Sequence, residues 1–509
     1  MKQLSGLDSV FLNLETPEAP MHVGAVTVLD LARAPKGFGF AAVRGRIAER
    51  LHLLPGLRRR LVTMPLNLIP PFWIEDPDFR LDRHVRRMKL QRPGGDHELA
   101  ALAADLIAAP LERAQPLWMF YYVEGLSGRR AACISIIHHA CVDGVSGAEL
   151  LGRLLDSAQP VRPPAPAGDW DPDELPLALD RLLFTARQAW IRQRQFAQLV
   201  RQSLPLALRF GRAWLGQAPA PGQAAAAVPA GLPPAPHTRF NVAIDARRSY
   251  GFASLSLPRI RAVKGALRMT VNDVLLTLCA GALRSYLQER NELPAQPLVA
   301  AVPISVRTPR SGVAGGNQVT LLTAELPTHL AEPLARAGAV SLATARLKKV
   351  HRAVPARLLM DWMELPAPAL VASAARLYQN FVNHDRVRPP VNLVISNIPG
   401  PQSPLFLAGA PLLGNYPISI PYHGLALNLT VLSYCDQLDV GVTAYAPALA
   451  DPAHLLGLME AALVELEAAA GLGDAGAPAV GAEGAAGPRP ARSERKSGRM
   501  RSRRIRPPH

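Results

Sequence analysis

Alternating apolar and polar segments along the chain predict a fold built from strands and helices in turn. Met21–Asp30 and Ala131–Ile137 are short apolar runs rich in β-branched residues, which is typical of buried strands. Gly39–Arg50 and Glu98–Ala109 instead carry apolar residues three and four positions apart, the spacing of one helix face. The mixture predicts a fold of the α/β class.

A second patterned region repeats this alternation later in the chain. The same spacings predict helices at Leu257–Lys264, Val271–Glu289 and His454–Ala470, and strands at Leu298–Val306, Val391–Ser396, Leu425–Ser433 and Leu438–Thr443. A turn at Tyr434–Gln437 joins the last two strands. Because 509 residues exceed one typical core, we expect two domains, an N-terminal one over 1–160 and a C-terminal one over 239–470.

Two segments outside these domains differ in composition. Residues 161–238 are first Pro-rich and acidic, then form a basic amphipathic helix over Leu177–Gln217, and end in an Ala/Pro/Gly-rich stretch. We interpret them as a linker that contains a helix. Residues 471–509 are rich in Ala, Gly and Pro and then in Arg, a composition that predicts a disordered tail.

Most of the net charge of +16 lies in those two segments. Residues 181–214 hold seven arginines and no acid, and residues 489–506 hold nine basic residues and one glutamate, so together they contribute +15. The remaining body is nearly neutral, and the tail lacks the interleaved aromatic residues of a single-strand binder, so we expect no specific nucleic-acid partner. The basic helix has two open interpretations, an interfacial helix on anionic lipid or an interdomain helix packed by its apolar face.

Other classes of protein and site are not favoured. Four scattered cysteines without a Cys-x-x-Cys pair argue against a disulfide framework or structural zinc. No run of about 18 apolar residues and no signal-peptide core is present, so we expect a cytoplasmic protein. Walker and dinucleotide glycine patterns are missing as well, and we expect no cofactor and no metal.

The segment that carries chemistry is His-His-Ala-Cys-Val-Asp-Gly, residues 138–144. It follows the strand pattern of Ala131–Ile137 and precedes Ser146–Glu149, which has the spacing of a capping box at a helix start. The histidines therefore lie where a strand ends, in a position to face a cleft. Imidazole is the side chain whose ordinary pKa suits proton transfer near neutral pH.

Several further segments, taken with this motif, give the chain a family resemblance. It resembles bacterial wax ester synthases/acyl-CoA:diacylglycerol acyltransferases over about residues 3–470, in blocks at Leu4–Leu12, Pro20–Gly24, Pro116–Trp118, Asn272–Asp273, Pro303–Arg307, Gly316–Asn317 and Ser396–Pro401. Two features depart from the family. Leu438–Gly441 lacks the aromatic of the Asp-Phe-Gly sequence common in related acyltransferases, and the Arg-rich tail has no counterpart known to us.

The resemblance implies a fold and a reaction. The fold would be two chloramphenicol-acetyltransferase-like, CoA-dependent acyltransferase domains, each with a mixed sheet flanked by helices, and with a channel between them. The reaction would move a long-chain acyl group from acyl-CoA, a substrate rather than a cofactor, to diacylglycerol or a long-chain alcohol, giving triacylglycerol or wax ester. The sequence ranks neither acceptor. Such substrates imply peripheral contact with the inner membrane or with lipid inclusions.

The resemblance also assigns roles within the site. His139 would be the general base, with His138 supporting it and Gly144 providing backbone freedom. Asp143 would stabilise the loop through an ion pair, although its spacing from His139 also allows an orienting role. For Asn272 two roles remain open, donor to the oxyanion of the tetrahedral intermediate or ordinary N-cap of a helix.

Two other functions remain as alternatives. One is a catalytically silent protein of the same fold that binds lipid or coats lipid droplets. The other is a condensation-type enzyme that forms amides, because such domains share the double-histidine motif.

Overall fold

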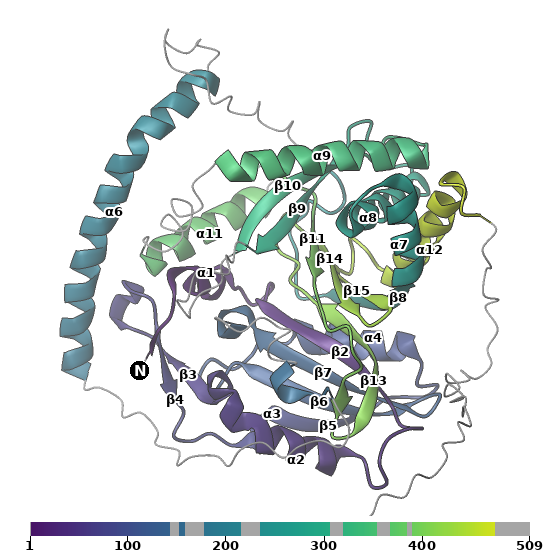
Figure 1. Ribbon diagram of the computed structural model, residues 1–509. Coiled ribbons are helices and arrows are strands. Elements are labelled where there is room, and N and C mark those ends of the chain that lie inside the picture. The colour runs from purple at the N-terminus through teal and green to yellow at the C-terminus, as the bar shows by residue number, and fades with distance from the viewer. Residues whose placement is uncertain are drawn as a thin grey trace, which may run out of the picture. The chain divides into compact units, whose positions relative to one another are not determined.

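Two six-stranded mixed sheets form the framework of the protein (Figure 1). The computed structural model describes residues 2–142, 152–157, 178–214, 235–305, 319–353, 367–383 and 389–473. The first sheet has the order β12-β13-β2-β7-β6-β5, with β2 His22–Asp30, β5 Val85–Lys89, β6 Trp118–Leu126, β7 Arg130–His138, β12 Phe406–Leu407 and β13 Ala410–Ile418.

The second sheet has the order β10-β9-β11-β14-β15-β8. Its strands are β8 Arg248–Ser256, β9 Leu298–Ser305, β10 Val319–Leu326, β11 Leu393–Ile398, β14 Leu427–Tyr434 and β15 Gln437–Tyr445. A small third sheet joins β1 Lys2–Gln3, β4 Phe72–Glu75 and β3 Arg59–Val62. The expected mixed α/β fold is confirmed.

Helices cover both faces of the first sheet, and the alternation of β7 shows why. Its residues Ala132, Ile134 and Ile136 pack in one cluster with α4 (Asp96–Ala108). The intervening Cys133 and Ile137 pack in another cluster with α2 (Phe40–Arg50). Because successive side chains of a strand point to opposite faces, the continuously apolar run is what a sheet covered on both sides requires.

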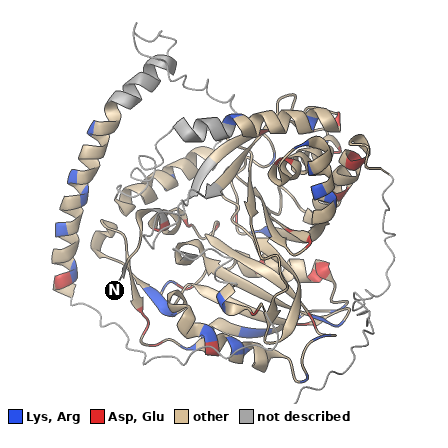
Figure 2. Ribbon diagram, viewed as in Figure 1, with Lys and Arg blue, Asp and Glu red and all other residues tan. Residues whose placement is uncertain are grey.

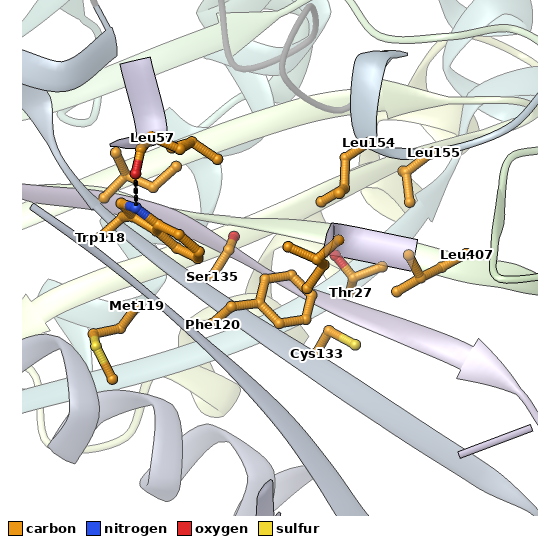
Figure 3. A pocket seen from close by; sticks show the side chains of 12 residues that line it. Thr27, Leu57, Trp118, Met119, Phe120, Cys133, Ser135, Leu154, Leu155 and Leu407 are labelled. Atoms are coloured by element: carbon orange, nitrogen blue, oxygen red, sulfur yellow. Dashed lines mark hydrogen bonds between the residues drawn. The ribbon is translucent and has the colours of Figure 1, made fainter. Parts of the chain in front are cut away.

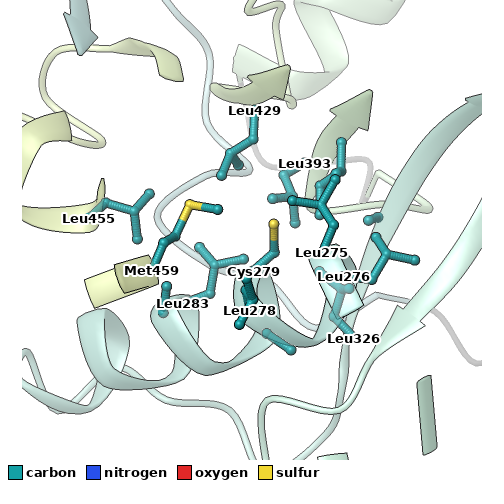
Figure 4. Packing of buried hydrophobic residues seen from close by; sticks show 14 of the residues in the cluster. Leu275, Leu276, Leu278, Cys279, Leu283, Leu326, Leu393, Leu429, Leu455 and Met459 are labelled. Carbon is teal, nitrogen blue, oxygen red and sulfur yellow. The ribbon is translucent and has the colours of Figure 1, made fainter. Parts of the chain in front are cut away.

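The largest cluster lies around α8 (Val271–Gln288), which is buried along most of its length. Figure 4 shows residues of α8, among them Leu275 and Leu278, beside Leu393 and Leu429 of the second sheet and Met459 of α12 (Pro452–Ala469). The further helices are α1 Gly6–Leu14, α3 Leu81–His84, α6 Ala178–Trp214, α7 Leu257–Leu267, α9 Pro333–Ala353 and α11 Pro368–Asn383. The described residues also form four 3₁₀ helices: η1 Leu51–Leu53, η2 Pro55–Arg58, η3 Pro65–Asn67 and η4 His139–Val142.

None of the described helices is long and apolar enough to span a membrane by itself. Only α7 and α8 taken together reach the necessary length and hydropathy, and they are bent by 102° relative to each other.

The elements expected from the sequence are confirmed to within a few residues. Strands β2, β7, β9, β11, β14 and β15 and helices α2, α4, α6, α7, α8 and α12 lie where the patterns predicted them. The expected Pro-rich stretch, the Ala/Pro/Gly-rich connection and nearly all of the tail lie outside the described residues.

Two strands, β12 and β13, cross between the two halves of the chain. β13 follows the second sheet's β11 in sequence, yet it pairs antiparallel with β2 of the first sheet, from Leu412 opposite Leu29 to Ile418 opposite Gly24. The first sheet is therefore completed by residues from the C-terminal part, a crossing that the domain limits expected from the sequence do not include.

The position of the altered Asp-Phe-Gly sequence lies at this crossing. The buried Asp439 carboxylate in β15 accepts hydrogen bonds from the backbone N–H of Asn415 in β13 at 2.7 Å and from the Ser254 hydroxyl at 2.7 Å. The Asn415 side chain in turn accepts a bond from Thr27 of β2 at 2.6 Å. A Cβ on Gly441 would stand 1.8 Å from the carbonyl oxygen of Pro417, so only glycine permits this approach of β15 to β13.

Candidate active site

The double-histidine motif begins at the end of β7, between the starts of two neighbouring strands. His138 donates its backbone N–H to the carbonyl of Leu117 at 2.9 Å, and His139 donates to that of Met21 at 2.8 Å. Leu117 and Met21 belong to two of the sequence blocks that supported the family resemblance, immediately before β6 and β2. These blocks therefore fix the backbone of the motif from both sides.

His138 is fully buried and its ring is held by two neighbours. Its Nδ1 accepts the backbone N–H of Ala140 at 3.0 Å, so in the neutral ring the proton lies on Nε2. That Nε2 lies 3.5 Å from a carboxylate oxygen of Glu15. Burial, and then the neighbouring His22, hold the pKa of His138 well below its usual value. Since both nitrogens have polar neighbours, His138 is placed to orient the motif.

The carboxylate of Glu15 lies close to several polar groups around the motif. One of its oxygens faces His138 and lies 3.8 Å from Nε2 of His22, the residue that pairs with His138 across β2 and β7. Its other oxygen accepts hydrogen bonds from Arg113, at 3.2 Å from Nε and 2.5 Å from the terminal nitrogen. Desolvation lowers the pKa of His22 to about 4, so it too is neutral near pH 7. Arg113 is thus the cation that pairs with Glu15.

α1 places an aromatic ring against the second histidine. Its N-cap is Ser5, whose hydroxyl accepts the backbone N–H of Asp8 at 3.1 Å, which fixes where the helix begins. Two turns later Phe11 stacks on His139 with ring centroids 3.8 Å apart and planes inclined by 20°. The first block of the family resemblance, which lies in this helix, therefore provides one wall of the site.

His139 is half-buried and electrostatically distinct from an ordinary surface histidine. Burial lowers the pKa of its ring to about 4, and its own backbone carbonyl offsets this only in part. Nδ1 is sealed from solvent and has no hydrogen-bond partner among the described residues. Because Nδ1 is sealed, Nε2 is the ring nitrogen that remains for contact with a substrate. A neutral imidazole can act as a general base through such a nitrogen.

Asp143 and Gly144, the other two motif residues, lie outside the described residues. The chain is described again from residue 152. The buried guanidinium of Arg50, at the end of α2, pairs with the buried carboxylate of Asp156 and donates to the carbonyl of Leu155 at 2.9 Å.

Asn272 is not the N-cap of α8. Thr270 holds that position, with its hydroxyl accepting the N–H of Asp273 at 3.1 Å while the Asp273 carboxylate accepts the N–H of Thr270 at 3.0 Å. The N-cap interpretation of Asn272 is thus wrong. Asp273 also accepts the hydroxyl of Thr344 in α9 at 2.7 Å, which ties the two helices together. The Asn272 side chain is partly exposed, and no hydrogen bond within the described residues joins it to either histidine.

A small apolar cavity lies on the α2 side of the first sheet (Figure 3). Its volume is about 40 Å³, and its lining includes Ile137, next to the motif, and Trp118, whose indole N–H donates to the carbonyl of Leu57 at 2.7 Å. The cavity accommodates only one or a few methylene groups or waters.

Cys141, inside the motif, contacts the carbonyl of Leu117, and burial raises the pKa of its thiol, which disfavours a nucleophilic thiolate.

The residues that sequence reasoning missed are Phe11, Glu15, His22 and Arg113. All of them lie far from the motif in sequence, and the contacts appear only once β2, β6 and β7 are paired. One local signal existed: Phe11 and Glu15 are four residues apart at the end of a predicted block, the spacing of one helix face.

Two mixed sheets, with a neutral histidine pair where a central strand ends, define an α/β protein of the CoA-dependent acyltransferase type. Family models match most of the chain: the wax ester synthase/diacylglycerol acyltransferase catalytic domain at residues 4–275 and the C-terminal domain of the same family at residues 315–467. The chain belongs to the wax ester synthase/diacylglycerol acyltransferase family.

Individual relatives agree with this membership. A protein of Mycobacterium tuberculosis named as a diacylglycerol O-acyltransferase is 36% identical over 473 residues, which cover 92% of this chain and 100% of the relative. Another of that species is 33% identical over 461 residues, covering 89% and 87% of the two chains. Among solved structures, the wax ester synthase/diacylglycerol acyltransferase from Marinobacter aquaeolei VT8 matches with a TM-score of 0.67 and 28% identity, covering 93% of this chain and all of the other.

Proposed function

We propose that this protein is an acyl-CoA-dependent O-acyltransferase that uses His139 as general base. The acceptor is the hydroxyl group of diacylglycerol or of a long-chain alcohol, and the product is triacylglycerol or wax ester. Membership of the family supports the reaction. The observation that supports the role of His139 is its ring, neutral at pH 7 and with Nε2 as the nitrogen that remains for contact with a substrate.

The reaction follows from ordinary acid–base chemistry at that nitrogen. Nε2 takes the proton of the acceptor hydroxyl while the oxygen attacks the thioester carbonyl carbon, giving a tetrahedral intermediate with a negative oxygen. The intermediate collapses by breaking the carbon–sulfur bond, and the imidazolium returns its proton to the CoA thiolate. One ester and one thiol are formed, and the enzyme is unchanged. We propose that Asn272 stabilises the oxyanion, a role for which its partly exposed amide at the second position of α8 is available.

The low pKa of His139 has two opposite effects on the reaction. It keeps the imidazole unprotonated at neutral pH and makes the imidazolium a ready proton donor to the leaving thiolate, but it also makes the imidazole a weaker base toward the acceptor hydroxyl. Glu15, Arg113 and His138 contribute by orienting the backbone that carries His139. Among the described residues, no group of three or more His, Cys, Asp or Glu side chains is arranged to bind a metal ion, and the chemistry proposed here uses protein groups alone.

The partners that follow are acyl-CoA and a lipid hydroxyl. Long-chain substrates of this kind partition into lipid, because each buried methylene contributes about 0.8 kcal/mol. We therefore infer that the enzyme works in peripheral contact with a membrane or with the surface of lipid inclusions.

The test is thiol release from palmitoyl-CoA, with and without hexadecanol or diacylglycerol. We expect acceptor-dependent release that His139→Ala lowers by about 10²–10⁴-fold. His97→Ala, which changes an exposed histidine of α4, is the matched control and should leave turnover unchanged. A wild-type protein without acceptor-dependent release, or a His139→Ala variant as active as the wild type, would refute the proposal.

A further inference from the structure

Helix α6 exposes an unusual amount of apolar surface. Seven large apolar side chains of its described part are more than one-third exposed. One of them, Phe184, contacts Phe72 of the body, and the other six are Leu179, Leu182, Leu183, Trp190, Val200 and Leu204. Leu183 and Trp190 are each 62% exposed. Exposed apolar residues are ordinary when scattered singly, whereas a contiguous group marks an interaction surface.

These six side chains lie on one side of the helix. Successive residues of an α-helix are turned by about 100°, which places all six in a sector about 100° wide. We call this sector the apolar strip of α6. The buried residues of α6, Thr185, Leu199 and Ser203, lie on another side, turned about 130° from the centre of the strip. The strip is therefore not the face by which α6 packs.

Three arginines border the strip along one edge. Arg187, Arg194 and Arg201 are exposed and seven residues apart, so they form a row next to the strip. The guanidinium of Arg194 lies 4.8 Å from the centre of the Trp190 ring, which joins the row to the strip. Residues 181–214 contain no acid that would neutralise this row. Figure 2 shows the basic positions along α6.

α6 is attached to the body through contacts with residues in and around η3. The ring of Phe184 contacts that of Phe72 with centroids 5.6 Å apart, and Ala189 packs against the cluster of Met64, Ile69 and Phe72. η3, the short helix next to these residues, also contacts α6 and carries Leu66, whose side chain is 79% exposed.

We propose that the apolar strip of α6 and its arginine row together form a docking surface for an anionic phospholipid membrane. The inference rests on the proposed function, since it states where that enzyme meets the phase that holds its substrates. Apolar side chains beside a row of cations without acids match the interface of such a membrane, where acyl chains lie below anionic headgroups. A second copy of the chain is the competing occupant. Its own strip would bring arginine rows of like charge together, which disfavours that pairing.

The experiment is flotation of the full chain with vesicles. One set contains phosphatidylcholine alone, and the other contains about one-third phosphatidylglycerol. The triple variant Arg187→Gln, Arg194→Gln and Arg201→Gln is compared with a control in which Arg80, Arg261 and Arg346, exposed residues on other elements, are changed to Gln. The pair Leu183→Ser and Trp190→Ser is compared with Leu342→Ser and Val464→Ser, which change exposed residues of α9 and α12.

We expect the wild type to float with the anionic vesicles and to bind the neutral ones far more weakly. The arginine triple should weaken partitioning into anionic vesicles by about a hundredfold, because each cation near the surface contributes roughly fivefold. The Leu183 and Trp190 pair should weaken it by about tenfold or more. Both control variants should float as the wild type does, and thermal unfolding should show that all variants are folded.

Other outcomes separate the two proposals. Flotation that is equal for both vesicle types, or unchanged in the α6 variants, overturns the docking surface. Sedimentation that shows a dimer lost with the Leu183 and Trp190 pair, without vesicle binding, assigns the strip to a second copy instead. Thiol release from a short-chain acyl-CoA with a short-chain alcohol, measured without vesicles, tests the chemistry separately. Wild-type protein that floats but releases no thiol contradicts the proposed function and not the surface.

Discussion

The contact between Phe11 and His139 makes a specific prediction about the pH dependence of catalysis. Phe11→Ala removes the ring that lies 3.8 Å from the imidazole and lets water reach one of its two faces. Because desolvation is the main cause of the low pKa of His139, the substitution should raise that pKa. The acid limb of the activity profile should move upward in pH with it.

The size of the effect follows from the shift itself. Burial lowers the pKa of His139 from 6.5 to about 4, which corresponds to about 3 kcal/mol between the charged and neutral ring. If one face accounts for somewhat under half of this, the pKa rises by about one unit, to about 5. At pH 5 the fraction of neutral His139 then falls from about 90% to about 50%.

The assay is the profile of kcat/KM against pH between about 4 and 8, since this parameter reports ionisations of the free enzyme. A short-chain acyl-CoA and a short-chain alcohol keep both substrates in solution, and each variant is normalised to its own plateau. Phe11→Leu is the control, because leucine still covers the ring and should leave the acid limb in place. Unfolding is followed over the same pH range.

Two results would refute the reasoning. A wild-type acid limb near pH 6.5 would mean that His139 is not desolvated in the free enzyme. An unchanged limb in Phe11→Ala, with folded protein, would mean that Phe11 does not control the pKa of the base.

Four further predictions concern the site and the fold. Glu15→Gln, which removes the charge facing Arg113 and His138, should lower kcat/KM about tenfold in the same assay, and turnover equal to wild type would contradict its positioning role. Gly441→Ala should lower the unfolding free energy by about 3 kcal/mol in urea, because its Cβ would meet a carbonyl oxygen at 1.8 Å; a loss below 0.5 kcal/mol, about the range of surface substitutions, would contradict the close packing of β13 on β15. Thr270→Ala, which removes the cap of α8, should cost about 1 kcal/mol in the same measurement, and an unchanged midpoint would contradict it. The pKa of His22 is lowered on folding, so the unfolded chain binds more protons below pH 6.5, and the stability that His22 contributes above pH 6.5 is lost as the pH falls toward 4. His22 should account for about 2 kcal/mol of the loss at pH 5, so a folded His22→Phe variant should lose less stability than the wild type by about that amount, while His138 and His139 still titrate.

The spacing of apolar residues in the sequence predicted those strands and helices in which apolar and polar positions recur regularly. β7 and α8 are long apolar segments with clear ends, so their type and limits follow from local chemistry. β13 was not predicted, because Pro411, Gly414 and Pro417 interrupt its strand pattern. In the structure β13 has a register shift between Leu412 and Gly414 and contacts β14 and β15 of the second sheet, properties of the tertiary structure that no local window contains.

The active site likewise has features that the sequence predicted and features that depend on the folded structure. The motif predicted two histidines at a strand end, and its position after β7 is confirmed. The low pKa of His139 was not predictable, because it depends on Phe11 and on burial that arise only after the chain folds. The two interpretations of Asn272 could not be separated by spacing alone, since either Thr270 or Asn272 is a residue type that caps helices well.

The crossing of β13 has a consequence for how the protein is made. β2 can pair with β7 early in synthesis, but its other edge pairs with a strand that is translated 383 residues later, as Leu29 and Leu412 show. At about 5–20 residues per second, a nascent chain carries this open sheet edge for roughly 20–80 s. An unpaired edge is a template for association with other chains. We therefore expect the nascent protein to depend on chaperones, and expression to gain more from slower initiation or lower temperature than from any change at the site.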